Sequence, residues 1–217
     1  MFDNIQAVIF DMDGTLIDSM WVWESIDRDY LGMYGATYSA NFHKEIEGLS
    51  FVDTAIYFKK SFNIAKSIDE ILEDWHNMAC DKYEKEVKFK NGAISFLKKL
   101  KQHGIKTGIA TSNSRELVDI FLKANDAFKY FDCIMTSSEI QKSKPAPDIY
   151  LAVSDKLGVE PKNCLVFEDI PNGILAGINA NMYTCAVYDL YSEHCDKEKH
   201  EIANYYINDF TDKLCDI

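Results

Sequence analysis

Five short runs of apolar residues constrain the fold of this chain more than any other feature of its sequence. The runs are Ala7-Val8-Ile9-Phe10, Thr107-Gly108-Ile109-Ala110, Cys133-Ile134-Met135, Cys164-Leu165-Val166-Phe167 and Thr184-Cys185-Ala186-Val187. Each run is too short and too uniformly apolar to be a strand with one face in solvent. Such runs are typical of a parallel sheet that helices cover on both faces. They therefore predict the buried strands of one parallel sheet.

Segments with apolar residues at helical spacing separate these runs after Thr111. The segments cover residues 116–123, 146–157 and 173–180. Alternation of buried strands and helices is typical of α/β proteins. The sequence therefore predicts an α/β fold with a Rossmann-like, doubly wound parallel sheet.

The stretch between the first and second runs departs from this alternation. It contains no convincing strand, and residues 20–34, 51–62 and 68–85 carry apolar positions at helical spacing. We therefore predict an all-helical cap domain of residues 19–88, inserted into an α/β core domain of residues 1–18 and 89–217.

Charge and composition exclude several classes of partner. The net charge is −12 at pH 7, whereas nucleic acids and anionic membranes require a basic surface. No apolar run approaches the roughly 18–20 residues of a membrane span, and the start of the chain does not resemble a secretory signal. We expect a cytoplasmic monomer that binds neither nucleic acid nor membrane.

Cysteine and histidine give no pattern of a metal site. The six cysteines are scattered without a C-x-x-C pair, so structural roles are expected. His194 and His200 lie in the polar stretch 191–201, which we interpret as a solvated helix face. The other histidines carry no usable signal.

Polar residues follow the first four apolar runs. They are Asp11-Met12-Asp13-Gly14-Thr15, Thr111-Ser112-Asn113, Lys144-Pro145 and Glu168-Asp169. In an open α/β sheet the binding site lies beyond the carboxyl ends of the strands, so these residues are expected to meet at one edge. Taken singly, each also fits a structural role, such as a turn, a helix cap or a surface lysine.

Together these residues fit phosphoryl transfer. Clustered carboxylates repel one another and require a hard divalent cation, for which Mg²⁺ suits oxygen ligands. A lysine and loop N–H groups would hold a phosphate. The chemistry needs one aspartate to attack phosphorus and a second, two residues on, to protonate the leaving oxygen and later deprotonate water.

The four motifs resemble those of the haloacid dehalogenase-like superfamily. They are D-x-D-G-T after the first strand, a strand-ending threonine, K-P-x-P-D-x-Y, and E-D-x-x-x-G-x-x-A-G. Four motifs in the same order are specific, although each alone is weak. The resemblance spans nearly the whole chain, because residues 19–88 stand where that family inserts a helical cap.

The resemblance implies a role for each motif residue. Asp11 is expected to be nucleophile and metal ligand, and Asp13 to be general acid and base with its main-chain carbonyl on the metal. Thr111 is expected to bond the transferring phosphoryl group, and Lys144 to neutralise it. Asp169, with Glu168 in support, is expected to hold Mg²⁺.

Four further residues are predicted to bind the substrate. Ser112 and Asn113 would offer backbone amides, unless they only begin a helix. Trp23 and Phe51 occupy cap positions that face the site in relatives of this kind. The alternative for these aromatic side chains, and for Trp21, Tyr30, Tyr34 and Tyr38, is the cap's own core.

The predicted function is a Mg²⁺-dependent phosphatase that acts on a small phosphorylated metabolite through an aspartyl-phosphate on Asp11. The pattern is most similar to β-phosphoglucomutase-like phosphatases, so a sugar-phosphate mutase is the alternative. The mutase's cap loop resembles K-G-x-S followed by arginine, whereas this chain has Glu47-Gly48-Leu49-Ser50-Phe51. Loss of both cationic positions favours hydrolysis. A non-catalytic module is disfavoured, because none of the six motif residues is degenerate.

Overall fold

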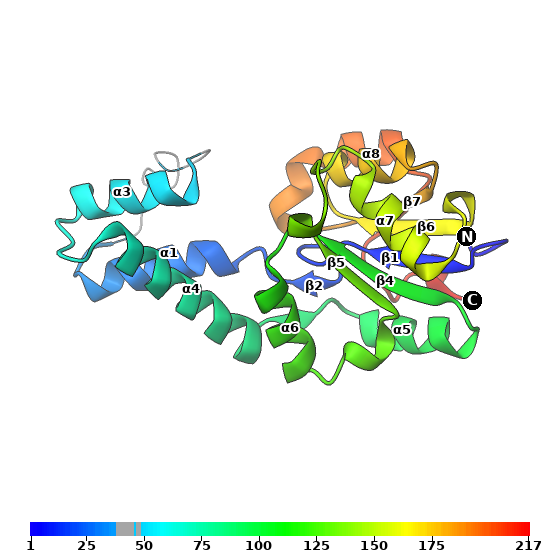
Figure 1. Ribbon diagram of the computed structural model, residues 1–217, viewed down its shortest axis with the longest axis horizontal. Helices are drawn as coiled ribbons and strands as arrows, with labels where there is room; N and C mark the ends of the chain where they lie inside the picture. Colours follow the sequence, from blue (N-terminus) through cyan, green and yellow to red (C-terminus); the bar gives the residue numbers. More distant parts are fainter. Residues whose placement is uncertain (38–45, 47–48) are drawn as a thin grey trace. The chain divides into compact units, whose positions relative to one another are not determined.

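The chain divides into two compact units. The computed structural model describes residues 1–37, 46 and 49–217. Met1–Met20 and Val87–Ile217 form one unit, here the core unit, and Trp21–Glu86 form the other, here the inserted unit. Figure 1 shows the strands of the large sheet in the core unit. Whether the inserted unit caps a functional site stays a prediction.

A parallel sheet organises the core unit. The strands are β1 (Ala7–Phe10), β2 (Ile17–Asp18), β3 (Lys88–Phe89), β4 (Lys106–Thr111), β5 (Cys133–Thr136), β6 (Cys164–Glu168), β7 (Tyr183–Val187) and β8 (Tyr205–Ile207). Among the described residues, six strands pair in the order β5-β4-β1-β6-β7-β8, each pair parallel. The five apolar runs thus correspond to β1 and β4 to β7. The edge strand β8 was not predicted, since its two tyrosines and one isoleucine give no buried run.

Helices cover both faces of this sheet. They are α5 (Ala93–Gln102), α6 (Arg115–Ala124), α7 (Asp148–Leu157), α8 (Pro171–Asn179) and α9 (Asp196–Ile202), with 3₁₀ helices at Phe128–Tyr130, Ser137–Glu139, Pro161–Asn163, Leu190–Cys195 and Lys213–Cys215. Figure 1 shows α7 and α8 on one side of the sheet and α5 and α6 on the other. The predicted doubly wound α/β fold is therefore confirmed.

Alternate residues of β1 pack against the two helical layers, because successive strand side chains point to opposite faces. Ala7 and Ile9 lie in one buried cluster with residues of α7 and α8. Phe10 faces the other way, with its ring 5.3 Å from that of Phe167 and 6.1 Å from that of Phe96. This packing explains why the strand is apolar at every position.

The inserted unit is helical throughout its described residues. It contains α1 (Val22–Met33), α3 (Phe51–Ser61) and α4 (Ile68–Lys85), close to the predicted segments. Trp75 of α4 is buried, with its ring 5.8 Å from that of Tyr30 and 4.9 Å from that of Phe58. The alternative reading of the aromatic side chains as core therefore holds for Tyr30. Tyr38, Glu47 and Gly48 lie outside the described residues.

A short strand lies beside each of the two points where the chain passes from one unit to the other. β2 and β3 pair antiparallel, with Ile17 opposite Phe89 and Asp18 opposite Lys88. The expectation of no strand between the first two runs was wrong here. A two-residue strand is too short to show any periodicity in sequence.

Two other sequence expectations can be compared with the structure. The six cysteines all lie in the described part of the chain and are free thiols, as expected for structural residues. In the polar stretch 191–201, His194 and His200 are exposed but Ser192 and Lys199 are buried. The prediction of a solvated face was wrong for these two, because both form internal hydrogen bonds. None of the helices in the described ranges has the length and apolar character needed to cross a bilayer.

Candidate active site

The carboxyl ends of three adjacent strands bring the predicted site residues together. β1 lies between β4 and β6 in the sheet. Asp11 directly follows β1, Thr111 is the last residue of β4, and Glu168 is the last residue of β6. The side chains of all three are buried. The sheet order therefore explains why residues more than 150 positions apart share one site.

Lys144 links these strand ends through its ammonium. Nζ lies 2.6 Å from Asp11 Oδ1 and 2.6 Å from Glu168 Oε1, and it donates to the main-chain oxygen of Ala110 at 3.0 Å. An ammonium has three protons to donate, so these bonds use its full capacity. Burial disfavours the charge of Lys144, but Asp11 and Glu168 outweigh burial and raise its pKa. Lys144 is therefore a fixed positive charge between two carboxylates.

Glu168 is held from several sides. The Tyr150 hydroxyl donates to Oε1 at 2.8 Å, and the main-chain N–H of Asp169 donates to Oε2 at 3.1 Å. A Cβ at position 173, in the first turn of α8, would lie 1.8 Å from Oε1. Glycine at this position therefore makes room for the carboxylate. These bonds suit Glu168 to a supporting role better than to a freely available ligand.

Gly173 offers a direct test of this packing. Gly173→Ala is expected to push Glu168 away from Lys144 and lower stability by about 1–3 kcal/mol, with activity falling on the order of tenfold. The matched control is Gly32→Ala in α1, where an added Cβ meets nothing within 4 Å. That substitution should raise helix stability by about 0.5–1 kcal/mol without loss of activity. Thermal unfolding and turnover measure both, and equal behaviour of the two variants would contradict the assignment.

Asp169 is fixed beside this group. The Thr15 hydroxyl donates to Oδ1 at 2.9 Å. Gly14 has φ +75°, and a Cβ there would lie 2.5 Å from Oδ2 of Asp169. The glycine of D-x-D-G-T therefore serves both a left-handed turn and the close approach of a carboxylate.

The three carboxylates form a candidate cation site by charge and donor type. Oxygens of Asp11, Glu168 and Asp169 all lie within 4.8 Å of one another. Burial raises the pKa of Asp11 well above its ordinary value, and Lys144 opposes that shift. Burial, followed by the charge of Glu168, raises the pKa of Asp169 to about 7. One ammonium does not balance three carboxylates, and their oxygens are the ligand type that Mg²⁺ prefers.

Asp13 is not one of these three clustered carboxylates. The Ser19 hydroxyl donates to Oδ1 at 2.7 Å, and the Asn113 side-chain amide donates to Oδ2 at 2.9 Å. The backbone N–H of Asn113 donates to Thr111 Oγ1 at 3.0 Å. Asn113 therefore orients Asp13 and Thr111 in this structure, whereas the sequence had suggested only a backbone amide for substrate. The carbonyl of its neighbour Ser112 accepts from the Ser137 hydroxyl at 3.2 Å.

Sequence reasoning assigned no role to three of these supporting residues. Thr15 and Tyr150 stand inside the quoted motifs, D-x-D-G-T and K-P-x-P-D-x-Y, so their motif positions were the available signal. Ser19 lies beyond the first motif, and no pattern in the sequence distinguishes it. Its bond to Asp13 depends on how the chain turns after β1.

Trp23 and Phe51 are neighbours within the inserted unit. Their ring centroids are 5.3 Å apart, and the residues are 40% and 47% exposed. These two are therefore not fully buried core side chains, unlike Tyr30. Their contact with a substrate stays a prediction.

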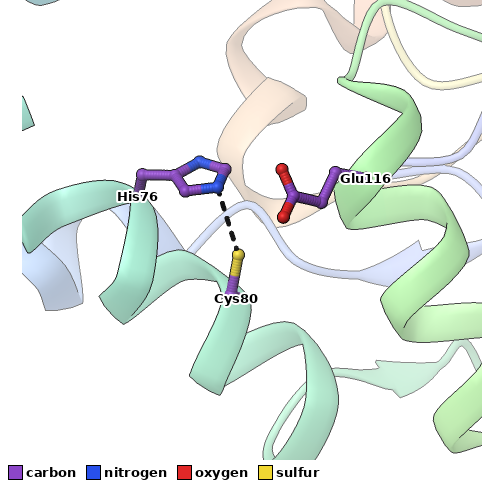
Figure 2. A group of neighbouring side chains, drawn as sticks. All are labelled: His76, Cys80 and Glu116. Atoms are coloured by element: carbon purple, nitrogen blue, oxygen red, sulfur yellow. Dashed lines mark hydrogen bonds between the residues drawn. The ribbon is translucent and has the colours of Figure 1, made fainter. Parts of the chain in front are cut away.

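Figure 2 draws the side chains of His76, Cys80 and Glu116, of which the first two belong to the inserted unit. His76 and Cys80 lie one turn apart on α4, with Nε2 3.5 Å from Sγ. Glu116, also labelled there, belongs to the first turn of α6 in the core unit. Helix geometry alone brings residues four apart together, so the pair on α4 needs no ligand to explain it.

Comparison with known proteins decides the family. Residues 8–187 match the sequence profile of the family described as haloacid dehalogenase-like hydrolase. The chain belongs to that family. The resemblance inferred from the four motifs is thus confirmed, and so is the hydrolase class.

The relatives of this haloacid dehalogenase-like hydrolase include named phosphatases. It is 29% identical to a phosphorylated carbohydrates phosphatase of Thermotoga maritima, over 82% of each chain. It is 30% identical to a bifunctional riboflavin kinase/FMN phosphatase of Arabidopsis thaliana over 91% of this chain, but it spans only 52% of that protein. A Thermotoga maritima protein described as a candidate β-phosphoglucomutase has a similar structure, with a TM-score of 0.84, 27% identity and 94% of each chain covered.

Proposed function

We propose that this enzyme is a Mg²⁺-dependent phosphatase that hydrolyses a small phosphorylated metabolite through an aspartyl-phosphate on Asp11. The observation that most supports this proposal is the position of Asp11. Its side chain is buried at the end of a central strand, 2.6 Å from the Lys144 ammonium, and is clustered with two other carboxylates. The family and its named phosphatases support the same reaction class. The negative net charge of −12 supports the absence of nucleic-acid and anionic-membrane partners, and we further propose that the protein is a cytoplasmic monomer.

Asp11 and Asp169 would hold Mg²⁺, with Glu168 in support and the main-chain carbonyl of Asp13 as a further oxygen. The bound ion would supply positive charge to the phosphate oxygens. Three close carboxylates with one ammonium support this assignment. Lys144 adds a second, permanent positive charge that no proton transfer at neutral pH removes.

In the first half-reaction, a carboxylate oxygen of Asp11 forms a bond to phosphorus while the ester P–O bond breaks. Asp13 gives its proton to the leaving oxygen, so the alcohol departs neutral. Thr111 is proposed to bond the transferring phosphoryl group. The bonds from Ser19 and Asn113 to Asp13 support this division of roles, because they hold its carboxyl in one orientation.

In the second half-reaction, Asp13 takes a proton from water as the water oxygen attacks phosphorus. The bond between phosphorus and Asp11 breaks, which releases inorganic phosphate and restores the Asp11 carboxylate. Lys144 remains bonded to Asp11 as charge returns to it. Each proton and oxygen is thus accounted for without a further co-reactant.

A sugar-phosphate mutase is the second candidate, supported by the similarity to the candidate β-phosphoglucomutase. In a mutase a second sugar hydroxyl, rather than water, would accept the phosphoryl group. A second phosphate needs cationic side chains, and this chain has Phe51 where the mutase loop carries arginine. We therefore favour hydrolysis, with Trp23 and Phe51 contacting the leaving group of the substrate and Ser112 offering a backbone amide.

The test is phosphate release from a panel of phosphorylated metabolites, with and without Mg²⁺. Sugar phosphates and FMN belong in the panel because relatives are named for phosphorylated carbohydrates and FMN. We expect Mg²⁺-dependent release that a chelator stops. Interconversion of sugar-phosphate isomers without net release, activated by a bisphosphorylated sugar, would instead establish the mutase.

A further inference from the structure

A buried lysine and serine lie behind Asp169. Ser192 is 4% exposed and Lys199 is 0% exposed. The Ser192 hydroxyl donates to the main-chain oxygen of Asp169 at 2.8 Å, and Lys199 Nζ donates to Ser192 Oγ at 3.1 Å. Lysine is almost never fully buried unless it is paired. Here it pairs with Asp196 Oδ1 at 2.6 Å and faces the ring of Tyr206 at 5.9 Å.

Lys199 determines which way the serine proton points. An ammonium only donates, so Ser192 Oγ must accept from it. The serine's own proton is then directed to a carbonyl, and Asp169 O at 2.8 Å is nearer than Asp189 O at 3.4 Å. The result is a directed chain of hydrogen bonds that ends on the main chain of Asp169.

The bond from Ser192 holds Asp169 beyond the point at which the hydrogen bonds of the sheet end. The last register pair of β6 with β7 is Glu168 with Ala186, so the Asp169 carbonyl lies beyond the ladder. Ser192 fixes this carbonyl, and Thr15 fixes the carboxylate through Oδ1. Two anchors on one residue restrict the direction in which Oδ2 can point.

The segment that carries Ser192 is itself held in place. Lys90 Nζ lies 2.7 Å from Asp189 Oδ2 and donates to the main-chain oxygen of Tyr188 at 2.7 Å. Asp189 Oδ1 accepts from the backbone N–H of Tyr191 at 2.9 Å. Lys90, which precedes α5, and Lys199 of α9 therefore hold this segment on both sides of its first turn.

We propose that Ser192, oriented by Lys199, is a positioning residue for Asp169 that raises the affinity of the carboxylate cluster for a divalent cation. This inference rests on the proposed function, in which Asp169 is a metal ligand. Groups that orient a ligand from behind commonly change metal affinity by 10–100-fold when removed.

The experiment measures Mn²⁺ binding to the full chain by electron paramagnetic resonance, with Mg²⁺ as competitor and no substrate present. Ser192→Ala is expected to weaken binding on the order of tenfold, and Lys199→Met to weaken it in the same direction. Ser154→Ala is the matched control, because that serine is also buried and donates to a main-chain oxygen, that of Leu151 at 3.2 Å. Its Mn²⁺ affinity should stay that of the unsubstituted protein.

Thermal unfolding of the same variants separates positioning from simple structural support. A structural role alone would lower the melting temperature of Ser192→Ala and Ser154→Ala alike and leave Mn²⁺ affinity unchanged, which would overturn the inference. If Ser192→Ala does not fold, the same comparison of Mn²⁺ affinity and melting temperature is made with Lys199→Met. That variant keeps the Ser192 hydroxyl but no longer fixes the direction of its proton. Asp169→Asn tests the proposed metal site independently: unchanged binding there would overturn the site itself.

Discussion

Replacing Asp11 with asparagine is expected to reduce phosphate release on the order of 10⁴-fold or more. The amide that replaces the carboxylate is a poor nucleophile and leaves no route to the aspartyl-phosphate. Its shape is nearly unchanged, and one of the three crowded carboxylates disappears. The measurement is Mg²⁺-dependent phosphate release from the best substrate of the panel, with the far-ultraviolet circular dichroism of both proteins compared.

Stability provides the control for this variant. The pKa of Asp11 is raised by burial and by Glu168 and Asp169, while Lys144 opposes these effects. Without a divalent cation, Asp11→Asn should therefore unfold at a temperature no lower than that of the unsubstituted protein, and Mg²⁺ should stabilise it less. Retained turnover in a folded variant would exclude an aspartyl-phosphate on Asp11.

The parallel sheet could be predicted because its strands are buried on both faces. Runs such as Ala7–Phe10 and Cys164–Glu168 are apolar or nearly so at every position, since helices pack on each side. The motif residues could be predicted for the same reason. Asp11 and Glu168 mark the ends of apolar strands, and the order of the parallel strands then places them at one edge.

The supporting contacts could not be predicted because they depend on side chains brought together by tertiary structure. Lys199 lies in a stretch of charged residues, and its immediate neighbours in sequence, Glu198 and His200, are both polar, so they do not indicate its burial. Ser19 bonds Asp13 only because of the turn between β1 and β2. The strands β2, β3 and β8 were missed because a strand of two or three residues is too short to show a periodic pattern of apolar residues in sequence.

Replacing Lys144 with methionine is expected to have the largest effect on stability. It keeps the length of the side chain but leaves Asp11 and Glu168 buried without their shared ammonium. Removing one partner of a buried ion pair costs about 3–5 kcal/mol. Activity should fall on the order of 10³-fold, as for loss of one preorganised charge at a transition state. Urea unfolding and phosphate release measure the two effects.

The loss of stability in Lys144→Met should depend on pH. Lys144 opposes the upward shift of the Asp11 pKa, so its removal raises that pKa further above the ordinary value of 3.8. A group with a raised folded-state pKa stabilises the fold while it is protonated, and that contribution falls as pH rises through the folded-state pKa. The variant should therefore be less destabilised at pH 5 than at pH 8.

Added Mg²⁺ tests the same charge argument in a second way. In Lys144→Met the three carboxylates have no ammonium beside them, so they repel one another more strongly than in the unsubstituted protein. Mg²⁺ should therefore raise the melting temperature of Lys144→Met more than that of the unsubstituted protein. The control is Lys99→Met, which removes a surface ion pair with Asp216 at 2.8 Å and should change little at either pH. A pH-independent loss of stability in Lys144→Met that Mg²⁺ does not reduce would mean that packing, rather than the charge of Lys144, holds the carboxylates together.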